Sequence, residues 1–140
     1  MKQLVLICLP MAAVLLFSVP AHAQVLVIAN PSVKAVEITK SEVRDLFTGE
    51  TRNLKEGGRV NPVFLKGGPA HTEFLLDFLH MPDAMVRTCW SRLVFAGQAT
   101  MPRSFETEAT LVEFIAHTPG AIGYITQTTP HEDVKVLILK

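Results

Sequence analysis

The chain has 140 residues, 49% of them hydrophobic, and its 13 basic and 13 acidic side chains cancel. Its length fits one domain with a modest core and excludes two large domains. A chain without net charge and without runs of lysine or arginine lacks the electrostatic footprint of a nucleic-acid-binding protein or of a protein that binds anionic membrane surfaces.

Residues 1–23 have the pattern of a secretory signal peptide. Lys2 precedes an apolar run from Leu4 to Val19, and the tripeptide Ala21-His22-Ala23 has the small-x-small form of a cleavage site. We expect cleavage after Ala23, so that residues 24–140 form a periplasmic domain. No second apolar run in the chain is long enough to span a bilayer.

The mature chain mixes strand-like and helix-like segments. Short apolar runs between turn residues predict strands, and amphipathic runs with capping residues predict helices. In chain order we expect a strand over 24–29, a helix from Thr39 to Gly49, a strand over 60–65, helices from Pro69 and from Pro82, a loop over 98–105, a helix over 108–117 and strands over 121–125 and 134–139. This order predicts an α/β domain of about four strands and four helices.

The clearest amphipathic stripe belongs to the helix predicted between Pro82 and Gly97. Its apolar residues recur at the spacing of one helix face, which predicts that the stripe packs on the core. Its members are Val86, Cys89, Trp90, Leu93 and Val94. We therefore expect Trp90 to be a core residue and Cys89 to be a buried, unreactive thiol.

Sequence signatures of catalysis are missing. The chain contains no GxxxxGK[ST] phosphate loop, no GxSxG elbow, no HExxH and no CxxC pair. The triplet His71-Thr72-Glu73 matches the H-x-E of the zinc deaminases, but the P-C-x-x-C that completes their zinc site is absent. We expect no catalytic residue, no metal and no cofactor.

One segment points to a ligand, and its candidate binding residues are Lys66, Gly67, Gly68, Ala70, His71 and Thr72. Glycines before a helix let peptide N–H groups converge, and the helix start adds partial positive charge. His71 and Thr72 could donate to an anion from the first turn. The alternative is a plain strand-to-helix turn, in which Pro69 removes one donor.

Three segments together resemble the phosphate ABC transporter substrate-binding proteins, which are type 2 periplasmic binding proteins. Ile38–Gly49 is similar to their L-T-x-x-x-[LV]-x-x-[IL]-F-x-G segment, and Val63–Phe74 takes the place of their V-x-R-x-x-G-S-G-T-x-x-x-F phosphate loop. Thr118–Tyr124 reads TPGAIGY, as in their turn and strand, and is the most specific of the three.

The resemblance implies a single lobe of the type 2 fold, because the family proteins have two lobes that close around phosphate and residues 24–140 supply one. In the phosphate loop, the G-S-G-T core is replaced by Gly-Pro-Ala-His and the arginine by Lys66. We therefore predict a periplasmic solute-binding-like protein for phosphate or a similar oxyanion, with a membrane transporter or envelope sensor as its partner. The alternative is an interaction module that keeps the fold and binds no ligand.

Overall fold

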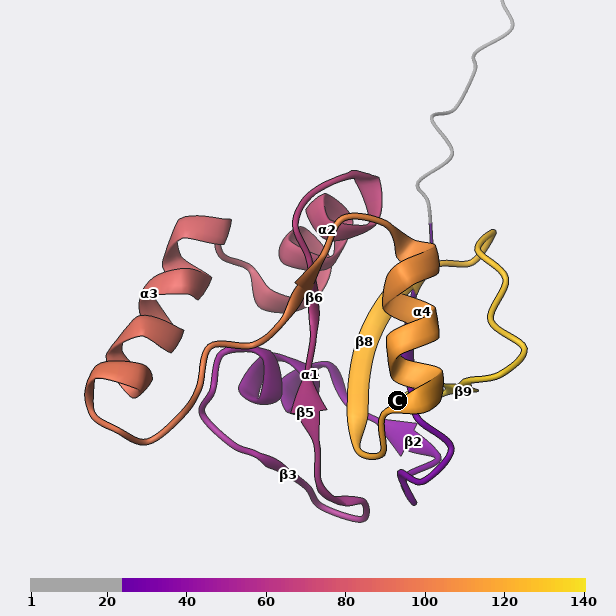
Figure 1. Ribbon diagram of the computed structural model, residues 1–140, viewed down its shortest axis with the longest axis horizontal. Helices are drawn as coiled ribbons and strands as arrows, with labels where there is room; N and C mark the ends of the chain where they lie inside the picture. Colours follow the sequence, from indigo (N-terminus) through magenta and orange to yellow (C-terminus); the bar gives the residue numbers. More distant parts are fainter. Residues whose placement is uncertain (1–23) are drawn as a thin grey trace, which may run out of the picture.

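The computed structural model describes residues 24–140, which fold as a small mixed sheet between two layers of helices (Figure 1). The sheet has the order β5-β8-β1-β9, with β1 antiparallel to both β8 and β9 and with β5 parallel to β8. Its strands are β1 (Val25–Ala29), β5 (Asn61–Pro62), β8 (Ala121–Thr126) and β9 (Lys135–Val136).

Short two-stranded pairs surround this sheet. They are made by β2 (Glu37–Ile38) with β10 (Ile138–Leu139), β3 (Asn53–Leu54) with β4 (Gly58–Arg59), and β6 (Phe64–Leu65) with β7 (Ser104–Phe105). The helices are α1 (Lys40–Phe47), α2 (Pro69–Phe74), α3 (Asp83–Phe95) and α4 (Glu108–His117), and α2 continues into the π-helix η1 (Leu75–Leu79). None of the helices in this described part of the chain combines the length and apolar character that a bilayer crossing requires.

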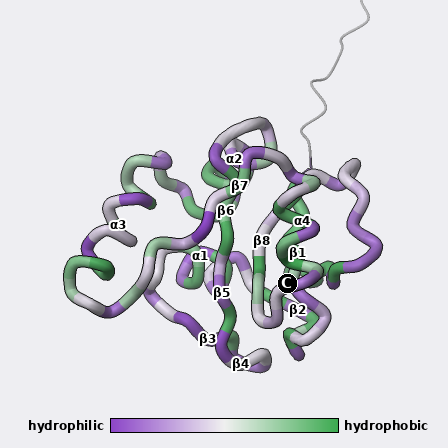
Figure 2. Tube along the Cα trace, viewed as in Figure 1, coloured by the Kyte–Doolittle hydropathy of each residue, from purple (hydrophilic) through white to green (hydrophobic). Residues whose placement is uncertain are grey.

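Alternate residues of β8 face the two outer layers, as the pleat of a strand dictates. A side chain at Gly123 would lie 2.7 Å from Cδ1 of Ile115, so this face is closely covered by α4. On the other face the Tyr124 ring stacks on Phe74 of α2, with ring centroids 3.8 Å apart. Hydrophobic segments accordingly concentrate along β1, β6 and β8 (Figure 2).

The predicted α/β class and its four α-helices are confirmed, but two predicted strands are divided. The strand expected over 60–65 leaves the main sheet after Pro62, and its second half pairs with β7 inside the segment expected to be a loop. The strand expected over 134–139 turns at Leu137 from β1 to β2. Each half finds a different partner strand, which residue patterns along one segment do not encode.

The prediction for α3 is only half right. Val86 and Trp90 are buried, whereas Cys89 is partly exposed, Val94 is exposed and the neighbouring Phe95 is 95% exposed. The stripe is only partly covered because α3 lies beside the sheet rather than over it, so that the rest of the protein packs against one side of the helix only (Figure 1). The apolar stripe is therefore wider than the surface available to cover it, and the expected burial of Cys89 is wrong.

Trp90 connects α3 to α1 by packing and by one hydrogen bond. The residue is 5% exposed, and its Nε1–H donates to the carbonyl oxygen of Phe47 at 2.9 Å. The residue is also the only tryptophan of the chain, which makes it a reporter of this contact.

We predict that Trp90→Phe lowers the free energy of unfolding by about 1–3 kcal/mol, because it leaves the buried carbonyl of Phe47 without its donor and leaves a gap. Urea unfolding followed by circular dichroism measures this change. The matched control is Phe95→Ala in the same helix, which should alter stability by less than about 0.5 kcal/mol. Equal losses from the two variants would contradict the assigned packing.

Candidate functional site

The predicted anion loop joins β6 to α2, and its start at the end of β6 is held by two hydrogen bonds. The N–H of Lys66 donates to the carbonyl oxygen of Phe105 at 2.8 Å, and the N–H of Leu65 donates to the hydroxyl of Tyr124 at 2.9 Å. Gly68 then has φ of +93°, a backbone conformation that side-chain-bearing residues rarely adopt. The loop therefore has a defined shape that depends on glycine at position 68.

Several peptide donors of this loop have no partner among residues 24–140. Within residues 24–140, no acceptor is found for the N–H groups of Gly67, Gly68, Ala70 and His71. A side chain built at either glycine would meet no atom within 4 Å, so the backbone there faces open space. Unpartnered N–H groups at the start of a helix carry partial positive charge and attract anions.

Two of the side chains predicted to bind the anion already have partners within the protein. Lys66 Nζ lies 3.2 Å from Oε1 of Glu106 in an exposed ion pair, and the Thr72 hydroxyl donates to the carbonyl oxygen of Gly68 at 3.1 Å. Ala70 is buried. An exposed ion pair contributes little free energy, so Lys66 remains available to a competing anion.

His71 points away from the loop and into the protein. The residue is 5% exposed, and its Nδ1 lies 2.5 Å from the hydroxyl of Tyr124. Its Nε2 lies 2.9 Å from Oδ1 of Asp83, the first residue of α3. Both ring nitrogens are thus used inside the fold, and only the peptide N–H of His71 is left for a ligand in the loop.

The hydrogen bonds along this chain of contacts are constrained at its two ends. The N–H of Leu65 can only donate, so the oxygen of Tyr124 accepts there. At the other end the carboxylate of Asp83, which also pairs with Arg87 at 2.7 Å, accepts from Nε2 of His71, and the Tyr124 hydroxyl is placed to donate to Nδ1. We call this series, Leu65 to Tyr124 to His71 to Asp83, the buried relay.

Tyr124 is the site residue that sequence reasoning missed. In the sequence it is only the last residue of the TPGAIGY segment, yet it is fully buried and touches both the loop and α2. Burial raises the pKa of its hydroxyl, the bond from Leu65 lowers it in part, and the negative charge of Asp83 raises it further. The available signal was that it is the only tyrosine of the chain.

The buried relay is suited to holding position rather than to reacting. Its ring nitrogens and hydroxyl are enclosed and already paired, and the bonds tie β6, α2, α3 and β8 together around the loop. Among residues 24–140 no group of three or more histidine, cysteine, aspartate or glutamate side chains could hold a metal ion.

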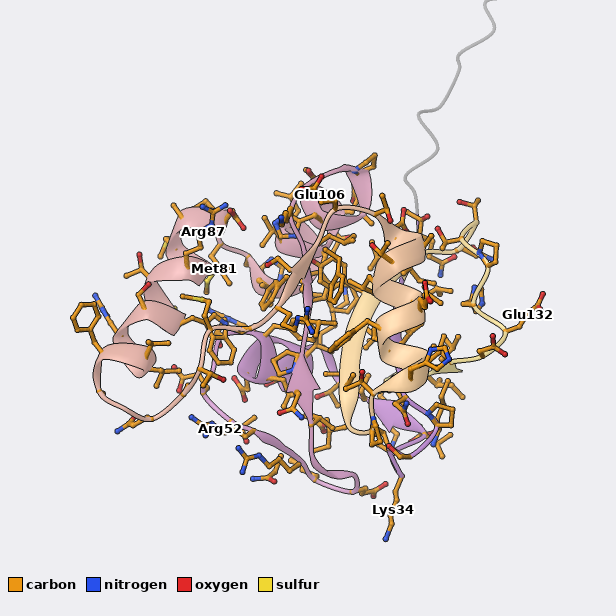
Figure 3. The ribbon with its side chains drawn as sticks, in the orientation of Figure 1. Lys34, Arg52, Met81, Arg87, Glu106 and Glu132 are labelled. Atoms are coloured by element: carbon orange, nitrogen blue, oxygen red, sulfur yellow. The ribbon has the colours of Figure 1, made fainter. Side chains whose placement is uncertain are left out.

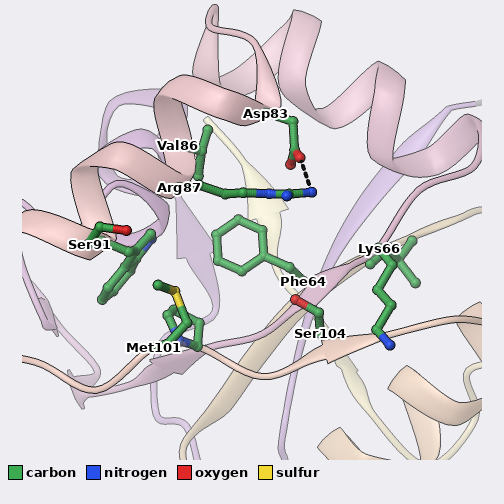
Figure 4. Close-up of a pocket in the computed structure, with 11 residues that line it drawn as sticks. Phe64, Lys66, Asp83, Val86, Arg87, Ser91, Met101 and Ser104 are labelled. Carbon is green, nitrogen blue, oxygen red and sulfur yellow. Dashed lines mark ion pairs between the residues drawn. The ribbon is translucent and has the colours of Figure 1, made fainter. Parts of the chain in front are cut away.

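A cavity of about 440 Å³ adjoins the loop between α3 and β7. Phe64, Val86 and Met101 contribute apolar walls, while Asp83, in its ion pair with Arg87, and Lys66 lie on the side opposite Met101 and Ser91 (Figure 4). Because Lys66 belongs to both the cavity and the loop, an anion held by the loop would lie at the edge of this space.

Comparisons with known proteins add the fold. No protein-family model matches the chain, and no curated protein matches it. Solved structures do match: a phosphate ABC transporter substrate-binding protein with bound phosphate from Clostridium perfringens has 15% identity and a TM-score of 0.62 over 82% of this chain and 44% of its own. This chain has the fold of part of such a binding protein.

Two further structures agree. PstS from Borrelia burgdorferi has 17% identity and a TM-score of 0.61, over 83% of this chain and 47% of its own. An ABC-type phosphate transport receptor from Vibrio cholerae has 12% identity and a TM-score of 0.56, over 82% and 45%. The chain spans less than half the length of these proteins. The structural matches confirm the predicted resemblance and the predicted single-lobe fold at the level of structure.

The raised pKa of Tyr124 predicts a dependence of stability on alkaline pH. The folded protein favours the neutral phenol, so this contribution is complete below the ordinary pKa of 10.0 and is lost progressively as the pH rises above it. Ultraviolet difference titration should show no phenolate until the circular dichroism signal of the fold is lost, and the urea-unfolded protein, as control, should titrate normally. Phenolate formation near pH 10 in the intact fold would contradict the burial.

Proposed function

We propose that this protein binds phosphate or a similar small oxyanion at the loop from Lys66 to Thr72. The observation that carries the proposal is the set of N–H groups at Gly67, Gly68, Ala70 and His71, which lack an acceptor within residues 24–140 and lie beside open space. Such a backbone arrangement binds phosphate, sulfate and carboxylate groups through hydrogen bonds and partial charge.

The fold supports the same ligand class, because one protein with this fold contains bound phosphate and others are described as phosphate transport or phosphate-binding proteins. Lys66 would add the only full positive charge in the loop. With one lobe and no arginine fork the site stays open to water, so we expect a Kd on the order of 0.1–1 mM.

Export to the periplasm is part of this proposal. It rests on the pattern of residues 1–23, which lie outside the residues that the structure describes. A membrane transporter would be the natural recipient of the anion. Intact-mass analysis of protein recovered from the periplasm should show a chain that starts at Gln24, and a mass that includes Met1 would refute the cleavage.

A second candidate function is an interaction module without a ligand. It is favoured by the orientation of His71, whose ring nitrogens bond within the fold, and by the Thr72 hydroxyl, which bonds back to Gly68. Both predicted side-chain donors are thus satisfied without an anion. The two candidates differ in one measurable property, which is heat of binding.

We predict that isothermal titration of the protein with phosphate, sulfate and arsenate detects binding, and that substitutions in the loop change it in opposite directions. Glu106→Gln should strengthen phosphate binding by about twofold to fivefold, because it frees Lys66 and removes a repelling carboxylate. Lys66→Gln should weaken it by a similar factor. Gly67→Val should weaken it further, because the added side chain occupies the open space without clashing with the protein.

Lys34→Gln is the matched control, since it removes one exposed lysine away from the loop. It should leave the affinity unchanged, and thermal melts should show that all four variants stay folded. If about 20 mM of each oxyanion gives neither heat nor a melting shift in the wild-type protein, the interaction module replaces the binding proposal.

A further inference from the structure

A second hollow of about 280 Å³ lies away from the oxyanion loop, since none of the residues from Lys66 to Thr72 lines it. Its cationic residues are Arg52, Arg59 and Arg103, and no aspartate or glutamate is among its lining residues. We call it the arginine groove. Figure 3 shows Arg52 projecting from the chain that leads to β3, at the opposite end of the view from Glu106.

The backbone brings the three arginines together. The carbonyl oxygen of Arg52 accepts the N–H of Val60 at 2.9 Å, and the carbonyl oxygen of Arg103 accepts the N–H of Phe64 at 2.9 Å. Arg59 immediately precedes Val60 in the chain. All three therefore lie on or beside the segment 59–64, although they come from separate parts of the sequence.

The guanidinium groups are free to bind. None of the three arginines forms an ion pair with another residue among 24–140, whereas Arg87, which is outside this groove, pairs with Asp83. The guanidinium carbon of Arg103 lies 5.0 Å from the ring centroid of Phe114, which holds that side chain over an aromatic face. Like charges gathered without counter-charges repel one another, and an anionic partner would relieve that repulsion.

The rest of the groove is half apolar. Trp90, Met101 and Phe114 contribute hydrophobic surface between the arginines, and Thr100 and Thr118 contribute polar groups. An inorganic anion would neutralise the arginine charges but would leave this hydrophobic surface exposed to water. A ligand that alternates carboxylates with an apolar side chain would satisfy both, because each guanidinium can hold one carboxylate through two parallel hydrogen bonds.

We propose that the arginine groove binds an acidic, extended segment of a partner protein, in which carboxylate residues flank a hydrophobic one. The charge complementarity of three unpaired arginines around an apolar floor selects this occupant. The site is independent of the oxyanion loop and would operate whether or not phosphate binds there. It gives the domain a way to engage an envelope protein by its acidic sequence.

Fluorescence anisotropy with a labelled peptide, Glu-Asp-Leu-Glu-Asp with blocked ends, tests the proposal. The matched peptide Gln-Asn-Leu-Gln-Asn has the same shape without charge. We expect the acidic peptide to bind with a Kd on the order of 10–100 µM at low salt, to weaken as salt rises, and to change the emission of Trp90 in the groove. The uncharged peptide should bind at least about tenfold more weakly.

Two triple variants test whether the acidic peptide binds in the arginine groove. Replacing Arg52, Arg59 and Arg103 together with glutamine should weaken the acidic peptide at least about tenfold. The control replaces three exposed cations outside the groove, Lys34, Arg44 and Arg92, with glutamine and removes the same total charge. It should retain most of the affinity, and thermal melts of both triple variants check that each is folded.

Three results would overturn the proposal: no binding of the acidic peptide at low salt, equal loss in the two triple variants, or equal affinity for the uncharged peptide. Displacement by tripolyphosphate as effective as that by unlabelled peptide would identify a general polyanion site and would also overturn it. Gly67→Val should bind the peptide normally, so a failure of the oxyanion proposal leaves this result readable on its own.

Discussion

One buried peptide group governs the arrangement around the loop. At the end of β6, the N–H of Leu65 lies in the interior, where a donor without an acceptor would cost about 1–3 kcal/mol. The hydroxyl of Tyr124 accepts it, and the same hydroxyl contacts Nδ1 of His71, whose Nε2 contacts Asp83. These contacts tie α2 and the start of α3 to the end of β6.

The relay also explains why the loop can be open. Its peptide donors face open space while the adjoining strand and helix are held by Tyr124 and His71 from beneath. A loop held this way loses little conformational freedom when an anion arrives, which favours binding by a site with few side-chain contacts. The same arrangement takes the His71 ring out of the set of ligand donors, so charge in the loop comes from Lys66 alone.

The sequence predicted the parts whose pattern is local. The apolar run at residues 24–29, the amphipathic helix over 108–117 and the TPGAIGY segment correspond to β1, α4 and the turn into β8. Local pattern did not reveal which surface covers α3, so it overestimated the burial of Cys89. The covering surface is set by the relative placement of the layers, which is a property of the whole chain.

Contacts between distant residues account for the rest of what was missed. Tyr124 and His71 are 53 residues apart, and each alone reads as an ordinary core or helix-end residue. The arginine groove likewise combines positions 52, 59 and 103, so a search for runs of basic residues does not find it. Both features arise because β6 leaves the main sheet and pairs with β7, which moves the chain near residue 103 beside residues 60–65.

The central claim is that the buried relay joins His71 to Tyr124 on one side and to Asp83 on the other, and the position of the proton on its ring tests this most directly. A long-range proton–nitrogen correlation spectrum of the folded protein at neutral pH distinguishes the two neutral tautomers and the charged ring. The relay predicts a proton on Nε2, which is donated to Asp83. An Nε2 without a proton would contradict the account, because the ring could then not donate to the carboxylate of Asp83.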